Sequence, residues 1–241
     1  LTDLAACRAQ LEVVLAARPV PPLPENVTIS EKYVPGFDGD PDVRVKMYTP
    51  DNLAPGSPAL VWIHGGGMVL LSADGDDFLC ATWAANHNCL VASVDYRLAP
   101  ETSAPGLVND CYAAFRHVAA NADVLGIDPN RIVLGGASAG GGLAAGTALL
   151  ARDQGGQQPA AQLLVFPMLD HSNTTESSHA IHDKRVWNRS ANLLAWEHYL
   201  GGAEPTIYSS PSTCDDVSGL PHAYINVGTM DMFHDEDIAY A

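Results

Sequence analysis

The chain has 241 residues, and its 12 Lys and Arg against 28 Asp and Glu give a formal net charge of −16 at pH 7. Hydrophobic residues make up 47% of the chain, which excludes intrinsic disorder because that much apolar surface can be buried in a core. The acidic balance disfavours nucleic acid and anionic membranes as partners, since few cations are available to neutralise their phosphates. No apolar run reaches the length of a transmembrane helix.

The length suits one large α/β domain, a class that often fills about 200–250 residues. The cysteines are odd in number and form no C-x-x-C pair; they are Cys7, Cys80, Cys89, Cys111 and Cys214. Such a set is typical of reduced, mostly buried thiols. No signal-peptide pattern is visible, and we therefore expect a cytoplasmic protein.

The first forty residues differ in character from the rest. Leu4, Leu11 and Leu15 recur at helical spacing, which predicts an amphipathic helix. Prolines from Pro19 to Pro24 end it, because proline cannot continue a helix. We therefore expect an N-terminal helical cap segment over residues 1–40 and a core over residues 41–241.

Short apolar runs then alternate with helical stretches. The expected strands are residues 43–48, 60–63, 90–94, 132–134, 163–166 and 223–227, and the expected helices are 76–86, 108–120, 139–152 and 191–200. Unbroken apolar runs suit strands buried on both faces, so the alternation predicts a doubly wound α/β fold with a mostly parallel sheet. The polar stretch from His171 to Ser190 is long for a plain loop, which predicts a cap insertion over about residues 171–205.

The strongest chemical signal is the G-x-S-x-G motif from Gly136 to Gly140. It follows an expected strand and opens an expected helix, the context in which this motif turns sharply and exposes its serine, Ser138. The hydroxyl would lie near a helix N-terminus, where unbonded N–H groups favour developing negative charge. A glycine-rich turn with an incidental serine is the alternative interpretation.

A second glycine motif, His64 to Gly67, follows the expected strand at residues 60–63. Three glycines leave backbone N–H groups free to point at a ligand, and an oxyanion formed in acyl transfer needs two or three such donors. A phosphate-binding loop is the alternative, but no G-K-[ST] follows and residues 68–71 are apolar, which disfavours phosphate. His64 is interpreted as a structural residue that orients the loop.

With both motifs in this order, the chain resembles the hormone-sensitive-lipase-like branch of the α/β-hydrolases, a family of carboxylesterases and lipases. The resemblance runs from about Asp42 to the C-terminus and includes the stretches Asp95 to Glu101 (DYRLAPE) and Gly126 to Ile132 (GIDPNRI). It implies an α/β-hydrolase fold with a small helical cap, and it implies no cofactor and no metal.

The resemblance also implies roles for individual residues. Ser138 corresponds to the nucleophile, and the N–H groups of Gly66, Gly67 and Ala139 correspond to the oxyanion hole. In this fold the acid of the triad comes after the serine in the chain. Asp231, which follows the expected strand at residues 223–227, matches that acid; a helix N-cap is its alternative role.

The base of the triad is not accounted for. His234 is the one histidine after Asp231, and it lies one helical turn onward on an element leading away from the pocket. A triad histidine must contact both serine and acid. The family places it after one more strand, so we expect the C-terminal strand, the histidine loop and the last helix to be absent from this chain; loss of the base by the protein is the alternative. Ala137 is a second departure, because the family usually carries an acidic residue there.

Other polar clusters are interpreted as structural. Asp95, Arg97 and Glu101 suit an ion-pair and turn network. The remaining clusters lack the spacing of a zinc site or a calcium loop; they are His171, His179 and His182 with Asp183, and Asp74 and Asp76 with Asp77. The three histidines are expected to be exposed cap residues.

These patterns predict a serine hydrolase that cleaves carboxylic esters with short or medium acyl chains through a Ser-His-Asp triad and an acyl-enzyme. Met68, Val69 and Trp187 are expected to line the substrate pocket. One alternative is a non-catalytic small-molecule receptor of the same fold, such as the plant gibberellin receptors, which lack the triad histidine. An amidase or acyltransferase using the same serine is another. The expected partner is a small-molecule ester, and a homodimer is left open.

Overall fold

The structure, a computed structural model, describes residues 3–241. Its centre is a seven-stranded sheet in the order β1-β2-β4-β3-β5-β6-β7. β1 and β2 run antiparallel to their neighbours, whereas β4, β3, β5, β6 and β7 are mutually parallel. The strands are β1 (Val27–Val34), β2 (Val43–Pro50), β3 (Ser57–Ile63), β4 (Leu90–Asp95), β5 (Ile127–Ala137), β6 (Ala161–Val165) and β7 (Ala223–Asn226). The expected mostly parallel sheet is confirmed.

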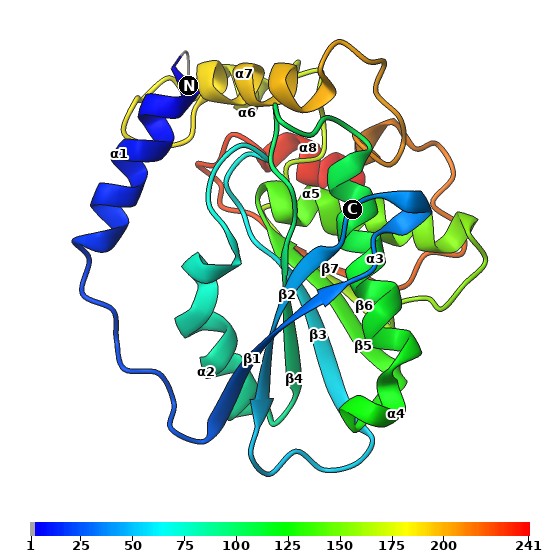
Figure 1. The fold of residues 1–241 in the computed structure, drawn as a ribbon. Helices are drawn as coiled ribbons and strands as arrows, with labels where there is room; N and C mark the ends of the chain where they lie inside the picture. The colour runs from blue at the N-terminus through cyan, green and yellow to red at the C-terminus, as the bar shows by residue number, and fades with distance from the viewer. Residues whose placement is uncertain (1–2) are drawn as a thin grey trace.

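Helices cover both faces of this sheet, with α2 on one side and α3 and α5 on the other (Figure 1). Within residues 3–241 no helix is long and apolar enough to cross a bilayer. The helices are α1 (Leu4–Ala16), α2 (Asp77–His87), α3 (Gly106–Ala120), α4 (Ala122–Leu125), α5 (Ala139–Asp153), α6 (Glu176–Ala180), α7 (Arg189–Leu200) and α8 (His234–Tyr240); the 3-10 turns are η1 (Phe37–Gly39), η2 (Ala73–Asp76) and η3 (Pro211–Thr213).

The two faces of the sheet bury separate apolar clusters. Val61 and Ile63 of β3 pack in the larger cluster with α3 and α5, whereas Trp62 between them packs in a smaller cluster with α2. Successive side chains of a strand point to opposite faces. Apolar packing on both sides therefore explains why these strands are unbroken apolar runs in the sequence.

The boundary expected at residue 41 is wrong in one respect. Residues 27–34 form β1, which pairs with β2 from Val27 opposite Pro50 to Val34 opposite Val43. The sheet therefore begins inside the segment expected to be a helical cap. Of the β1 residues only Val34 is buried, so the strand lacks the apolar run by which the other strands are recognised.

The parallel strands bring four loops to one edge of the sheet. The His64–Gly67 loop follows β3, Ser138 follows β5, Phe166 follows β6, and the segment containing Asp231 follows β7. α6 and α7 lie over this edge, with α1 beside them (Figure 1). Ligand sites of α/β folds form beyond the carboxyl ends of the strands, and the expected site residues gather there.

Candidate active site

Ser138 occupies a sharp turn between β5 and α5. Its φ of 56° and ψ of −122° are a conformation that residues other than glycine rarely adopt. The turn is held by neighbouring backbone, because Ser138 N–H donates to Val165 O at 2.9 Å and Ser138 O accepts from Met168 N–H at 2.9 Å. The side chain is half-buried. In the described residues no hydrogen bond involves its hydroxyl.

The glycine loop after β3 lies directly against this turn. A methyl group at Gly65 would come within 3.5 Å of Ser138 Cβ and 3.1 Å of Ala137 O. On the other side, a methyl group at Gly140 would overlap the carbonyl groups of Ile63 and His64. At Gly140, only glycine permits this close approach to backbone. The two motifs singled out in the sequence are therefore in contact.

Unbonded backbone donors are present around Ser138. No protein group accepts a hydrogen bond from the N–H groups of Gly66, Gly67 or Ala139 within residues 3–241. Gly66 and Gly67 adopt φ values of 110° and 61°, a region open to glycine at little cost. Ala139 is the first residue of α5, so its N–H group has no acceptor inside the helix.

Tyr96, a buried tyrosine that was not predicted as a site residue, is hydrogen-bonded to the glycine loop. Tyr96 Oη donates to the carbonyl oxygens of His64 and Gly65 at 3.0 and 3.2 Å. Its ring stacks on the imidazole of His64, with the centroids 4.2 Å apart. Burial lowers the pKa of His64, so the ring is neutral at pH 7. His64 orients the loop, as its position in the sequence suggested.

Asp231 lies beyond β7, two strands along the sheet from the strand that carries Ser138. Its Oδ1 accepts a hydrogen bond from Phe233 N–H at 3.0 Å, which fixes the turn into α8. No histidine side chain is hydrogen-bonded to the side chain of Asp231 or Ser138 in the described residues, and His234 Nδ1 instead lies 2.9 Å from Asp235 Oδ1. The local contact of Asp231 resembles capping and leaves its second oxygen without a bond to a described residue.

The cap reaches the glycine loop through Trp187. A methyl group at Gly67 would overlap the six-membered ring of Trp187, so the indole rests on the loop. Trp187 Nε1 donates to Asn192 Oδ1 at 2.9 Å, and Asn192 Nδ2 donates to Asn173 Oδ1 at 2.5 Å. Asn173 and Asn192 are fully buried. This polar chain holds the indole over Gly67.

Met68 and Val69 do not form the pocket wall that the sequence suggested. They are 1% and 0% exposed and pack in the larger apolar cluster. The chain turns at Gly66, Gly67 and Met68, all with positive φ, and this directs the two side chains into the core. Leu71, 37% exposed, is the apolar residue of this loop that has accessible surface.

The N-terminal cap segment is bonded to the same edge of the sheet by Arg8 of α1. Its guanidinium donates to Val69 O at 2.9 Å, to Ala99 O at 2.8 Å and to Glu101 at 2.6 Å. Glu101 of the DYRLAPE stretch therefore has Arg8 as its ion-pair partner. A groove of about 570 Å³ lies between α1 and residues 71–78.

The remaining acidic clusters are structural, as expected. Arg97 pairs with the buried Asp110 at 2.7 Å. Arg44 pairs with Glu31, Asp74 and Asp95, and the hydrogen bonds of Arg44 hold the pKa of Asp74 well below its usual value. No cluster suited to a metal ion occurs in residues 3–241.

The three histidines expected to be exposed differ from one another. His179 and His182 are exposed, but His171 is half-buried and bonds Ser210, contrary to expectation.

A strand–serine–helix turn against a glycine loop, at the carboxyl edge of a mostly parallel sheet, defines the α/β-hydrolases. A family model described as alpha/beta hydrolase fold matches residues 60–241, and the chain belongs to this family.

Known relatives are carboxylic ester hydrolases by name. Carboxylesterase NlhH of Mycobacterium tuberculosis is 39% identical over 231 residues, which cover 92% of this chain and 70% of the relative. Carboxylic ester hydrolase LipN of the same organism is 35% identical, over 99% of this chain and 64% of its own length. The solved structure of a bacterial heroin esterase superposes with a TM-score of 0.95 at 43% identity, covering 100% of this chain and 78% of that one. The chain is thus a carboxylesterase-type α/β-hydrolase.

Proposed function

We propose that the protein hydrolyses carboxylic esters with short or medium acyl chains through an acyl-enzyme formed on Ser138. Ser138 Oγ attacks the acyl carbonyl while a general base takes its proton, the alcohol leaves with that proton, and water attacks the acyl-enzyme to release the acid in a second step. The relatives named as carboxylesterases support the reaction class. The strained turn and the unengaged hydroxyl of Ser138 support the nucleophile.

The proposed oxyanion hole consists of the N–H groups of Gly66, Gly67 and Ala139. They have no acceptor in the described protein, and two of them belong to the loop that contacts Ser138. Donors placed before the reaction stabilise the negative charge that develops on the carbonyl oxygen. Each such donor contributes about 3–4 kcal/mol to the transition state.

Asp231 is proposed as the acid of the triad, on the basis of its place after β7. The general base must bond both Ser138 and an acid. His64 is buried beneath the glycine loop, and His234 pairs with Asp235. The proposal keeps a histidine as the base, as the resemblance implies, and assigns that role to no described residue. Trp187, resting on Gly67, is proposed to line the substrate pocket.

The observation that carries the proposal is the contact between Gly65 and Ser138. It supports an oxyanion hole in the glycine loop, because the loop lies beside the serine. The receptor alternative shares the fold but requires no nucleophile, and the retained Ser138, Asp231 and unbonded N–H groups favour the enzyme.

The proposal is tested by turnover in the full-length protein. We expect hydrolysis of p-nitrophenyl acetate and butyrate to exceed that of the matching p-nitroanilides, because p-nitroaniline is a poorer leaving group than p-nitrophenolate. A higher rate on the anilides would favour the amidase alternative. Binding of small esters without turnover would favour the receptor alternative.

The support of the glycine loop by Tyr96 leads to a separate prediction. Tyr96→Phe removes the hydroxyl that holds two carbonyl groups of the loop, which costs about 1–3 kcal/mol of folding free energy. If the loop supplies the oxyanion donors, their displacement lowers kcat by about 10-fold and leaves KM within about two-fold. Steady-state kinetics and urea unfolding measure the two effects.

Tyr208→Phe is the matched control. Tyr208 Oη donates to Asp153 Oδ2 at 2.8 Å at the last residue of α5, the end opposite to Ser138. Its kcat should equal that of the wild type. Unchanged kcat in Tyr96→Phe would show that the loop keeps its shape without this hydroxyl.

A further inference from the structure

The segment that leaves β6, residues 165–172, is bonded to the Ser138 turn. Val165 O accepts from Ser138 N–H, and Met168 N–H donates to Ser138 O, both at 2.9 Å. The start of α5 packs on the same segment so closely that a methyl group at Gly142 would overlap Met168 O. The position of Ser138 therefore depends on residues 165–168 as well as on its own helix.

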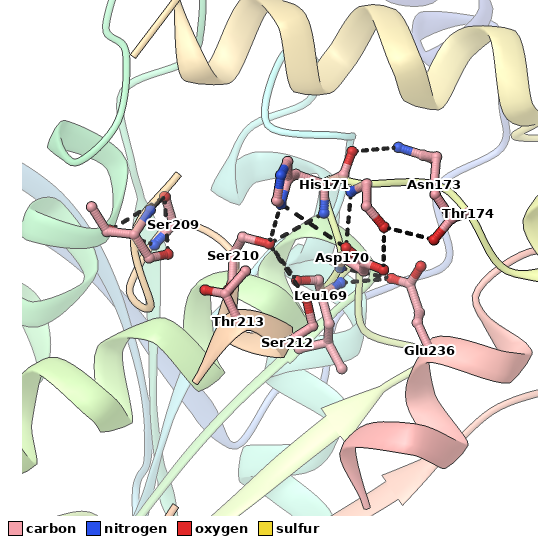
Figure 2. Close-up of polar contacts among 12 residues, drawn as sticks. Leu169, Asp170, His171, Asn173, Thr174, Ser209, Ser210, Ser212, Thr213 and Glu236 are labelled. Atoms are coloured by element: carbon pink, nitrogen blue, oxygen red, sulfur yellow. Dashed lines mark hydrogen bonds and ion pairs between the residues drawn. The ribbon is translucent and has the colours of Figure 1, made fainter. Parts of the chain in front are cut away.

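The next two residues of this segment are bonded to Glu236 of α8. Leu169 N–H and Asp170 N–H donate to Glu236 Oε1 at 2.8 and 3.1 Å (Figure 2). Glu236 is 3% exposed and Leu169 is 0% exposed. Water cannot readily replace the carboxyl there, so its loss would leave buried backbone donors unbonded.

Glu236 lies on the same short stretch of chain as Asp231. Asp231 N–H donates to Gly228 O, and Asp231 Oδ1 accepts from Phe233 N–H, one residue before α8 begins. The stretch is bonded to the cap as well, since Ser177 Oγ donates to Met232 O at 2.9 Å. A continuous set of bonded groups thus connects Ser138 to Glu236 and, through the turn before α8, to Asp231.

We propose that Glu236 is a positioning residue of the esterase site, whose buried carboxyl sets the place of the Asp231 turn relative to Ser138. It acts through backbone and does not contact the substrate. The inference rests on the proposed function, because the relative position of the two side chains affects catalysis only if they act in one triad. Errors of about 1 Å in such positions lower rates by about 100-fold.

Conservative replacements of Glu236 can separate the effect of its hydrogen bonds from the effect of burying a side chain at this position. Oε1 accepts both hydrogen bonds, and Oε2 is buried without a partner in the described residues. Burial raises the pKa of Glu236 to about 8, although the two N–H groups oppose the shift. The carboxyl is therefore mostly neutral at pH 7, and a glutamine amide offers the same acceptor. An aspartate is one methylene too short.

Asp237 provides the matched control. It is the next residue of α8 and is 1% exposed. Neither of its carboxyl oxygens has a hydrogen-bond partner within residues 3–241, so its side chain makes no hydrogen bond to the segment that holds Ser138. Removing it changes a buried carboxyl on the same helix and leaves the two hydrogen bonds of Glu236 in place.

The experiment measures kcat and KM for p-nitrophenyl acetate in the full-length protein, together with hydrogen exchange of the Leu169 and Asp170 amides. Glu236→Gln should keep both within about two-fold of the wild type. Glu236→Asp and Glu236→Ala should lower kcat by about 10-fold or more, with KM little changed, and should speed exchange at the two amides. Asp237→Ala should retain wild-type kcat.

A folded Glu236→Ala or Glu236→Asp variant with wild-type kcat would overturn the inference. So would a Glu236→Gln variant as impaired as Glu236→Ala. If Glu236→Ala does not fold, the kcat values of Glu236→Gln and Glu236→Asp are compared to test the inference. A wild-type protein without ester turnover contradicts the proposed function instead, and unchanged amide exchange in Glu236→Asp would then still refute the contact on which the inference depends.

Discussion

Ser138→Ala is expected to abolish ester hydrolysis in the full-length protein, lowering kcat/KM by about 10⁴-fold or more. The reason is that acyl transfer through a covalent intermediate has no route without the hydroxyl, whereas the unbonded N–H groups of Gly66, Gly67 and Ala139 remain in place. Alanine also relieves no clash, so the strained turn should persist and thermal stability should change little. Pre-steady-state release of p-nitrophenol, equal to one per active site in the wild type, should disappear.

Thr147→Val is the matched control for this variant. Thr147 lies in the same helix, α5, is fully buried, and has a hydroxyl without a partner in the described residues. Removing that hydroxyl perturbs the helix but not the turn, so turnover should stay near the wild-type value. If Ser138→Ala retained turnover, Ser138 would not be the nucleophile.

Gly140→Ala is expected to destabilise the fold by about 3 kcal/mol or more. The added methyl group would overlap the carbonyl groups of Ile63 and His64, which are backbone atoms and cannot move aside by changing a rotamer. The contact between α5 and the end of β3 would have to open, and the glycine loop would move away from Ser138. Urea unfolding should show a lower midpoint, and ester turnover should fall even in the protein that remains folded.

Gly75→Ala separates this effect from the general cost of replacing a glycine. Gly75 lies in η2, its added methyl group would meet nothing within 4 Å, and it does not have a positive φ. Its stability should equal that of the wild type or exceed it slightly, because alanine restricts the unfolded chain. Equal stability in Gly140→Ala and Gly75→Ala would mean that the two motifs are not packed as described.

Much of the fold could be predicted because apolar pattern and burial coincide. Residues 60–63 and 132–134 are unbroken apolar runs, residues 90–94 are apolar apart from Ser93, and each run lies within a strand that is packed in the core. β1 escaped prediction because it is an edge strand with one buried residue and a polar outer side, and it has no apolar run. β7, at the other edge, has no buried residue either, but its apolar residues allowed it to be predicted.

The candidate site was predictable where a short motif carries its own geometry. Ser138 and the glycine loop need no distant residue to be recognised, and the structure places them in contact. Tyr96 and Arg8 bond to residues 64–69 from positions far away in sequence, and no local pattern distinguishes them from other buried or charged residues. Met68 and Val69 were misjudged because the positive φ values that turn them inward cannot be read from an apolar run.

The contact between Trp187 and Gly67 affects how a ligand enters the site. The indole belongs to the chain just before α7, and the buried Asn192 and Asn173 hold its nitrogen. Any outward swing of that part of the cap must lift the ring from the glycine backbone. Admission of an ester past Trp187 would then uncover the backbone of Gly67, and closing the cap would cover it again.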